Sequence, residues 1–215
     1  MGKIILASSS PRRRDLLKKS KLKFEIIPSP YIEDHTTTVF SYEFIEGLAS
    51  NKALAVLPLV NEPSLIIGAD TVVVLENNIL GKPKDREDAF NMLRSLSGKT
   101  HIVVTGIAVV NSETHELKTA ASTSRVTFEN LTDEQINFYI NNFKPMDKAG
   151  SYGIQEMPNG YIKSYSGSLD NIIGLDVKLL KKMLSGITKD DKTIRLWVVK
   201  FKTGCLLIQL LTTLN

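Results

Sequence analysis

Serines and arginines around a proline form the first group of residues that could do chemistry, in L-A-S-S-S-P-R-R-R-D-L-L (6–17). A serine before a proline is typical of a helix start, because serine caps the helix and proline fits its first turn. Arg12 and Arg13 would then lie at the positive end of the helix dipole. Positive charges placed there indicate a site for an anion. A capped helix whose arginines are merely solvated is the alternative.

Two carboxylates could bind a divalent cation or transfer a proton. Asp70 stands in the middle of L-I-I-G-A-D-T-V-V-V, a nearly continuous apolar run, where an unpaired carboxylate would cost several kcal/mol. It therefore needs a metal ion, a cationic partner or a functional reason. Glu33 follows a strand-like run, in Y-I-E-D-H, and a solvated turn is the alternative for this residue.

Three further polar residues stand beside glycines. Lys82 lies between a glycine and a proline, at the end of a hairpin whose turn is indicated by Asn77 and Asn78. Lys148 and Gln155 flank the two glycines of M-D-K-A-G-S-Y-G-I-Q (146–155). These segments could hold polar groups against a phosphate, and ordinary exposed turns are the alternative for each.

Together these residues suit chemistry on a polyphosphate. Oxygen ligands without cysteine favour magnesium or manganese, and fixed lysines and arginines offset the charge of phosphates. The sequence has no G-x-x-x-x-G-K-[ST] loop and no G-x-G-x-x-G after a strand. A Ser-His-Asp hydrolase is possible on composition, but His35, His101 and His115 lack motif context and G-x-S-x-G is absent.

The elements that must position these residues alternate along the chain. Strand-like runs lie at 3–7, 23–27, 65–69, 71–75, 101–110, 119–128, 161–165 and 194–200. Helical periodicity appears at 11–20, 41–57, 85–96, 132–142 and 176–185, and a capping box marks Thr132 and Gln135. This alternation predicts an α/β protein with a mixed sheet.

Length and composition favour a single domain of a soluble globular protein. The 215 residues carry 27 basic and 23 acidic side chains, and without a basic stripe this balance argues against a nucleic-acid partner. The single cysteine, Cys205, excludes an internal disulfide and a cysteine-based zinc site. No apolar run is long enough for a membrane span or a secretory signal, so a cytoplasmic protein without a membrane partner is expected.

The chain resembles the Maf family of nucleoside-triphosphate pyrophosphatases, which is related in fold to the inosine-triphosphatase-like enzymes. The resemblance rests on several long motifs in the right order. They are L-A-S-S-S-P-R-R, Glu33, L-A-S-N-K-A (48–53), I-G-A-D-T (67–71), L-G-K-P (80–83), M-L-R-S-L-S-G-K-T-H (92–101), P-M-D-K-A-G-S-Y-G-I-Q (145–155) and N-I-I-G-L (171–175).

This resemblance implies a mixed sheet flanked by helices, with two lobes around a central cleft. It also implies metal-assisted attack of water on the α-phosphate of a nucleoside triphosphate, which yields the monophosphate and pyrophosphate. The family's catalytic positions fall on Arg13, Glu33, Lys52, Asp70, Lys82 and Gln155. Asp70 matches the general base, while Glu33 and Asp70 are the expected ligands of magnesium or manganese. Substrate contacts are expected from Ser8, Ser9, Ser10, Arg12, Thr71, Lys148 and Gln155.

The pyrimidine branch of the family has arginine, threonine and glutamine at the positions of Arg12, Thr71 and Gln155, which implies dTTP and UTP as substrates. A 7-methyl-GTP pyrophosphatase and a non-catalytic regulator of septum formation are the alternatives. Family resemblance favours a homodimer. Asp170 and Asp176 depart from the family pattern and are expected to alter the far wall of the cleft.

The end of the chain lies outside this pattern. Residues 1–186 are expected to form the pyrophosphatase domain, and 187–215 an extension of unknown role. Two apolar runs in the extension, 196–199 and 206–208, could form a terminal hairpin packed on the sheet or belong to a separate role.

Overall fold

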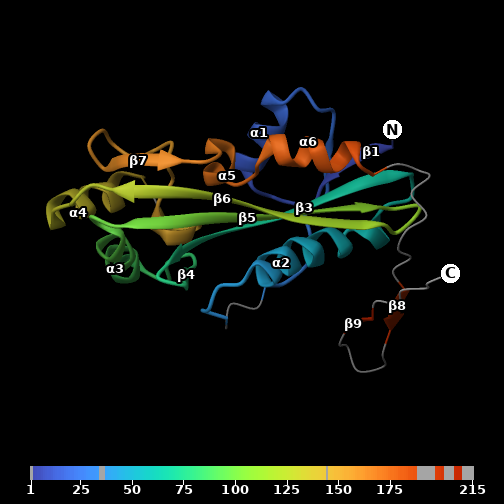
Figure 1. The fold of residues 1–215 in the computed structure, drawn as a ribbon, viewed down its shortest axis with the longest axis horizontal. Helices are drawn as coiled ribbons and strands as arrows, with labels where there is room; N and C mark the ends of the chain where they lie inside the picture. The colour runs from blue at the N-terminus through green and yellow to red at the C-terminus, as the bar shows by residue number, and fades with distance from the viewer. Residues whose placement is uncertain (1, 34–36, 144, 188–196, 201–205, 210–215) are drawn as a thin grey trace.

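A computed structural model describes residues 2–33, 37–143, 145–187, 197–200 and 206–209 (Figure 1). Its main sheet has seven strands. Their order is β2 (Glu25–Ile26), β1 (Lys3–Leu6), β3 (Ser64–Leu75), β5 (Thr100–Asn111), β6 (Leu117–Phe128) and β7 (Ile162–Ser166), with β4 (Asn78–Leu80) paired to β3. Strand β1 runs parallel to β2 and β3, and the remaining pairs are antiparallel. The predicted α/β class with a mixed sheet flanked by helices is therefore confirmed.

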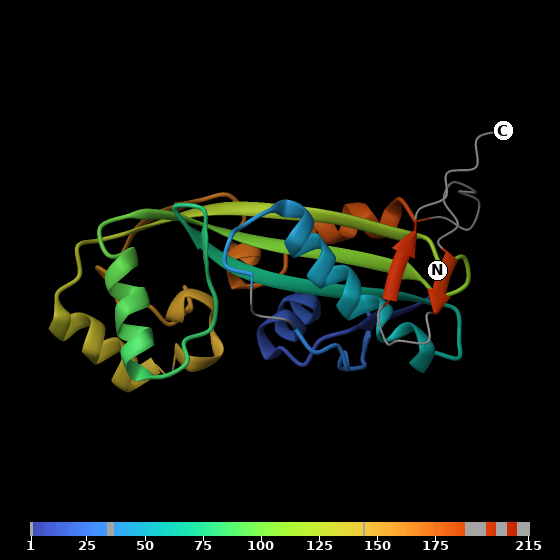
Figure 2. The ribbon, with the colours of Figure 1, turned by 90° about the horizontal axis from the view of Figure 1, so that it is seen from below.

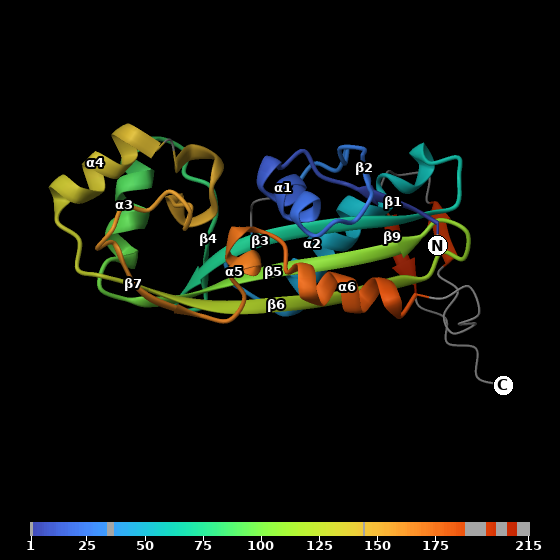
Figure 3. The ribbon, with the colours of Figure 1, turned by 90° about the horizontal axis from the view of Figure 1, so that it is seen from above.

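Helices cover both faces of the sheet. The helices are α1 (Pro11–Lys19), α2 (Tyr42–Leu54), α3 (Arg86–Leu96), α4 (Asp133–Phe143), α5 (Leu169–Ile173) and α6 (Val177–Ser185). Helices α1 and α6 lie on one face of the sheet and α2 on the other (Figure 1). Helices α3 and α4 gather at one end of the long strands, whereas β1, β2 and α1 lie nearer the other end (Figures 2 and 3). The long strands β3, β5 and β6 thus join two lobes.

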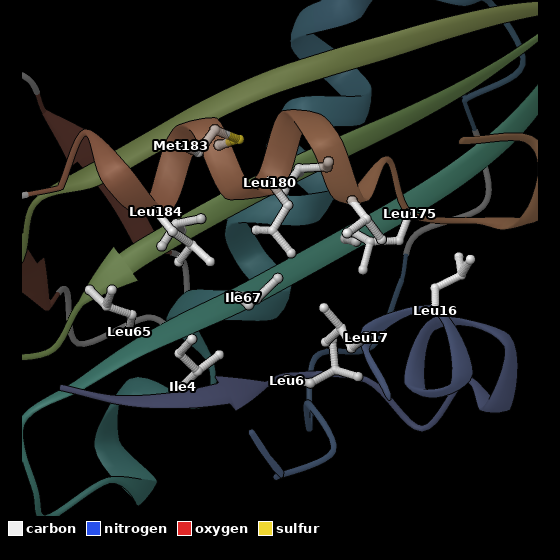
Figure 4. Close-up of a cluster of buried hydrophobic side chains, with 14 of the residues drawn as sticks. Ile4, Leu6, Leu16, Leu17, Leu65, Ile67, Leu175, Leu180, Met183 and Leu184 are labelled. Atoms are coloured by element: carbon white, nitrogen blue, oxygen red, sulfur yellow. The ribbon is translucent and has the colours of Figure 1, made fainter. Parts of the chain in front are cut away.

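Strand β3 is buried on both faces because its residues alternate between hydrophobic clusters on the two faces of the sheet. Leu65 and Ile67 pack with Leu17, Leu180 and the rest of one cluster under α1 and α6 (Figure 4). Ile66 faces the opposite way, against Ala49 and other residues of α2. Burying each large aliphatic side chain stabilises the fold by about 1.5–3 kcal/mol. The separate runs predicted at 65–69 and 71–75 are one continuous strand, with Asp70 inside it.

The sequence predicted the starts of α1 and α4 correctly and placed the turn between β3 and β4 one residue too late. Ser10 caps α1, and Thr132 and Gln135 form the predicted capping box at α4. The hairpin turn is Glu76-Asn77, since Leu75 pairs with Asn78. Both turn residues have positive φ, 50° and 69°, as a two-residue hairpin loop requires. The prediction of Asn77-Asn78 is wrong by one position, because Asn78 already pairs within the ladder.

Two other regions differ from the sequence predictions. Helix α5, which leads into the cleft, was not predicted because its five residues are too few to show a periodic pattern. Near the C-terminus, β8 (Trp197–Lys200) and β9 (Leu206–Gln209) pair antiparallel in a sheet of their own. Residues 188–196, 201–205 and 210–215 of the predicted extension lie outside the described part, whereas Ile187 is buried in the cluster under α1 and α6. Among the described residues, no helix has the length and apolar character that a membrane span requires.

Candidate active site

A cleft of about 960 Å³ opens between the two lobes. Its walls come from the β1–α1 turn, α2, the middle of β3, the segment after β4 and residues 147–156. All twelve site residues expected from the sequence line it: Ser8, Ser9, Ser10, Arg12, Arg13, Glu33, Lys52, Asp70, Thr71, Lys82, Lys148 and Gln155. Asp170 and Asp176 are not among the lining residues, so neither side chain forms part of the wall itself.

Lys52 forms the centre of the site together with two carboxylates. Its Nζ lies 2.7 Å from Glu33 Oε1 and also donates a hydrogen bond to Asp70 Oδ1. Lys52 and Asp70 are each only 8% exposed. The cationic partner that Asp70 requires inside its apolar strand is therefore Lys52, which compensates the loss of hydration of both charges.

Two glycines bring Lys52 to Asp70. A Cβ atom added to Gly68 would lie 2.1 Å from the carbonyl oxygen of Ala49, and one added to Gly106 would lie 2.4 Å from that of Ile45. Gly68 and Asp70 share one face of β3, and Gly106 is the neighbour of Asp70 on β5. The absent side chains let α2 rest directly on the sheet, so its Lys52 reaches the carboxylate.

The chemistry of this centre fits a divalent cation. Glu33 and Asp70 converge on one ammonium group, and carboxylate oxygens are the ligands that Mg²⁺ prefers. No group of three or more His, Cys, Asp or Glu side chains suited to a metal occurs in the described ranges. Magnesium sites in nucleotide enzymes commonly use one or two carboxylates and complete the shell with phosphate oxygens and water. The two carboxylates here match that pattern.

Arg13 is held rigidly at the start of α1. Its Nε donates to the carbonyl of Gly174 at 2.9 Å, Nη2 to Thr71 Oγ1 at 3.1 Å and Nη1 to Ser8 Oγ at 3.4 Å. Thr71 is itself bound to Thr105 across the sheet, at 2.9 Å. Burial lowers the pKa of Arg13, yet an arginine stays charged at neutral pH. The guanidinium is thus a preorganised positive charge in the cleft.

Arg12 and Lys148 share one carboxylate that the sequence had not singled out. Arg12 Nη1 lies 2.7 Å from Asp147 Oδ2, and Lys148 Nζ lies 2.8 Å from Asp147 Oδ1. Lys148 has Glu156 as a second partner at 3.1 Å. Burial raises the pKa of Asp147, but hydrogen bonds from Lys148 and Arg12 outweigh it and lower that pKa to about 2. The only sequence signal for Asp147 and Glu156 was their place beside Lys148 and Gln155.

Lys82, Gln155 and Ser9 are exposed side chains of the cleft wall. The loops that carry Lys82 and Gln155 are joined where Gly150 N donates to the Gly81 carbonyl at 3.0 Å. Gly150 has φ of 64°, and a Cβ there would lie 2.9 Å from the side chain of Val73. Of the two glycines that Lys148 and Gln155 flank, Gly150 is therefore a position at which only glycine fits without strain.

His101 supports the cleft from behind. It is 2% exposed, and its Nε2 lies 2.7 Å from the hydroxyl of Tyr152, which lines the cleft. Both rings pack edge-on against Phe128. Burial lowers the pKa of His101 to about 4. The histidine therefore acts as a neutral hydrogen-bonding partner of Tyr152.

This burial predicts a loss of stability in acid. Between pH 6.5 and 4 the unfolded chain binds a proton at His101 that the folded chain does not, so stability falls as pH falls. From pH 7 to 4.5 this group contributes a loss of roughly 2.5 kcal/mol. Urea unfolding at pH 7 and pH 4.5 should therefore show that the free energy of unfolding falls more for the wild type than for His101→Gln. Equal drops in the two proteins would contradict this role of His101.

Comparisons with known proteins give consistent results. The family model described as "Maf-like protein" matches residues 3–187. A protein of Pelotomaculum thermopropionicum named dTTP/UTP pyrophosphatase is 44% identical over 184 residues, which cover 86% of this chain and 96% of that relative. A protein of the same name from Clostridium novyi is 41% identical over 184 residues, 84% of this chain and 95% of the relative.

A solved structure shows a more distant likeness. The HAM1 protein from Coxiella burnetii is 17% identical and matches with a TM-score of 0.48, over 87% of this chain and 100% of that one. A likeness at this level carries no information on activity.

Proposed function

The chain belongs to the Maf-like protein family, and on that premise we propose that it hydrolyses nucleoside triphosphates, preferentially dTTP and UTP, to the monophosphate and pyrophosphate. The names of its relatives support the substrate class. The observation that carries the proposal is the buried Lys52 held by Glu33 and Asp70 in a cleft lined by further cations. Such a cleft provides both a base and the positive charge that phosphoryl chemistry needs.

The cleft residues divide the reaction between them. A water molecule attacks the α-phosphorus, and Asp70 accepts its proton. The bond from the α-phosphorus to the oxygen that bridges to the β-phosphorus breaks, and pyrophosphate leaves with the electron pair. Lys52 and Lys82 offset the charge that develops on this leaving group, where a positioned donor is worth about 3 kcal/mol. Arg13 and the start of α1 hold the triphosphate in line.

Glu33 and Asp70 would hold a magnesium or manganese ion. When bound, such an ion supplies a Lewis acid for phosphate oxygens and lowers the pKa of bound water. Lys52 already lies between the two carboxylates. A bound ion would therefore compete with the Lys52 ammonium group for the oxygens of Glu33 and Asp70.

We propose that Arg12, Thr71 and Gln155 together set the preference for pyrimidine nucleotides. Thr71 contributes indirectly, by positioning Arg13, because its hydroxyl is hydrogen-bonded to both Arg13 and Thr105. Gln155 is exposed to the cleft, where its amide can both donate and accept hydrogen bonds. We further propose that residues 1–186 suffice for catalysis and that the protein is a homodimer.

A panel of triphosphates tests this function. With Mg²⁺, kcat/KM for dTTP and UTP should exceed that for 7-methyl-GTP by tenfold or more. This ratio corresponds to a difference in activation free energy of about 1.4 kcal/mol or more. The product should be pyrophosphate. EDTA should abolish the reaction, and Mn²⁺ should restore it. Release of orthophosphate alone, or preference for 7-methyl-GTP, would contradict the proposal.

A further inference from the structure

The described residues of the cleft are nearly balanced in charge, although the cleft is expected to receive a polyanion. Among these residues, six cationic and five anionic side chains line it. The cations are Arg12, Arg13, Lys52, Lys82, Lys84 and Lys148, and the anions are Glu33, Asp70, Asp88, Asp147 and Glu156. A triphosphate that enters this cleft must therefore compete with carboxylates for its cations, because phosphate and carboxylate oxygens use the same N–H donors.

Asp147 is the carboxylate best placed for this competition. It receives Arg12 from α1 on one oxygen and Lys148 on the other, 2.7 and 2.8 Å away. Arg12 Nη2 also donates to the backbone carbonyl of Asp147 at 3.2 Å. The residue thus joins two segments 135 positions apart in the sequence, one on each side of the cleft. Its side chain is 59% exposed, whereas that of Lys148 is only 8% exposed.

These exposures show which partner is able to leave. The Asp147 carboxylate can rotate into solvent, but Lys148 is confined, because a Cβ atom at Gly153 would lie 3.0 Å from Lys148 Cε. Lys148 also keeps a partner when Asp147 leaves, since Glu156 lies 3.1 Å from its ammonium group. Glu33 and Asp70 differ from Asp147, because both lie against the buried Lys52 at the centre of the site.

We propose that Asp147 is an internal placeholder for a substrate phosphate. In the free protein its two carboxylate oxygens bind Arg12 and Lys148, as two oxygens of one phosphate group would, and the incoming triphosphate displaces it. This inference rests on the proposed function. It adds a residue that sets substrate affinity by competition and that takes no part in the chemical step. Asp147 remains ionised at neutral pH, since its pKa lies near 2, so the competition operates throughout the neutral range.

The substitution Asp147→Asn tests the placeholder. It keeps the shape and the backbone contact to Arg12 but removes the negative charge. We expect Kd for a non-hydrolysable α,β-methylene analogue of UTP to fall about tenfold, as does Kd for inorganic pyrophosphate, because a like charge beside the phosphate is removed. KM should fall in parallel while kcat does not rise. Asp147→Glu should behave as the wild type does.

The matched control is Asp15→Asn, which removes a carboxylate paired with Arg14 on the same helix, 3.2 Å away, but outside the cleft. Its affinities should not change. A folded Asp147→Asn protein with unchanged or weaker affinity overturns the placeholder and makes Asp147 a positioning residue. If the melting temperature of Asp147→Asn is lower than that of the wild type, Asp147→Ser provides the same test. Wild-type protein that turns over no triphosphate refutes the proposed function instead, whereas turnover without tighter binding refutes only the placeholder.

Discussion

Asp70→Asn should lower kcat for dTTP and UTP hydrolysis by about 10³-fold, because the amide can neither accept a proton from the attacking water nor hold a divalent ion with Glu33. The substitution is nearly isosteric, and the amide oxygen can still accept a hydrogen bond from Lys52. Substrate affinity should therefore change far less than kcat. Single-turnover kinetics with radiolabelled dTTP, together with the Kd of the methylene analogue, separate the two effects.

Asp176→Asn is the matched control for this variant. Asp176 is as buried as Asp70, at 8% exposure, but it caps α6 by accepting from Leu179 N at 3.0 Å and does not line the cleft. Asparagine caps helices about as well as aspartate, so activity should be retained. An Asp70→Asn protein with kcat near the wild-type value would remove Asp70 from the chemical step and leave it with a structural role beside Lys52.

Lys52→Met should reduce both activity and stability. It leaves Glu33 and Asp70 facing each other in a largely buried site without their shared cation, and breaking such a pair costs roughly 3 kcal/mol of folding free energy. The charge on the leaving pyrophosphate also loses one donor, which should lower kcat by about 10²-fold. Urea unfolding and steady-state kinetics measure the two losses.

The same variant also reports on the metal site. Once Lys52 no longer competes for the two carboxylates, millimolar Mg²⁺ should raise the melting temperature of Lys52→Met more than that of the wild type. Lys118→Met, which breaks an ion pair with the buried Glu116 outside the cleft, should lose stability without losing activity or gaining a response to Mg²⁺. If Lys52→Met is as stable as the wild type and ignores Mg²⁺, the carboxylates do not depend on Lys52 for compensation and do not bind the ion.

Much of the fold could be predicted from local patterns. The N-caps of α1 and α4 were predicted correctly because capping depends on residues within one helical turn. The long strands of the sheet were recognised from their branched apolar residues. The predicted turn, Asn77-Asn78, lies one residue beyond the observed turn, Glu76-Asn77. The register of the ladder depends on the partner strand as well as on the residue types in the turn.

The sequence predicted which residues gather, but not how their charges pair. The expected residues do line one cleft, and Asp70 was correctly required to have a partner in its apolar strand. Nothing in the local sequence indicated that this partner is Lys52 from α2, or that Asp147 forms ion pairs with both Arg12 and Lys148. Such pairings join segments far apart in the chain, and no local pattern specifies them.

The sequence by itself determined the types of charge, the helix starts and the family to which the chain belongs, because each of these is written in short contiguous motifs. Only the tertiary structure decided how the charges are paired. Gly68 and Gly106 show the physical reason: in the sequence they are single small residues within strands, but in the fold their missing side chains let α2 lie against the sheet. That close approach carries Lys52 to Asp70 and forms the centre of the cleft.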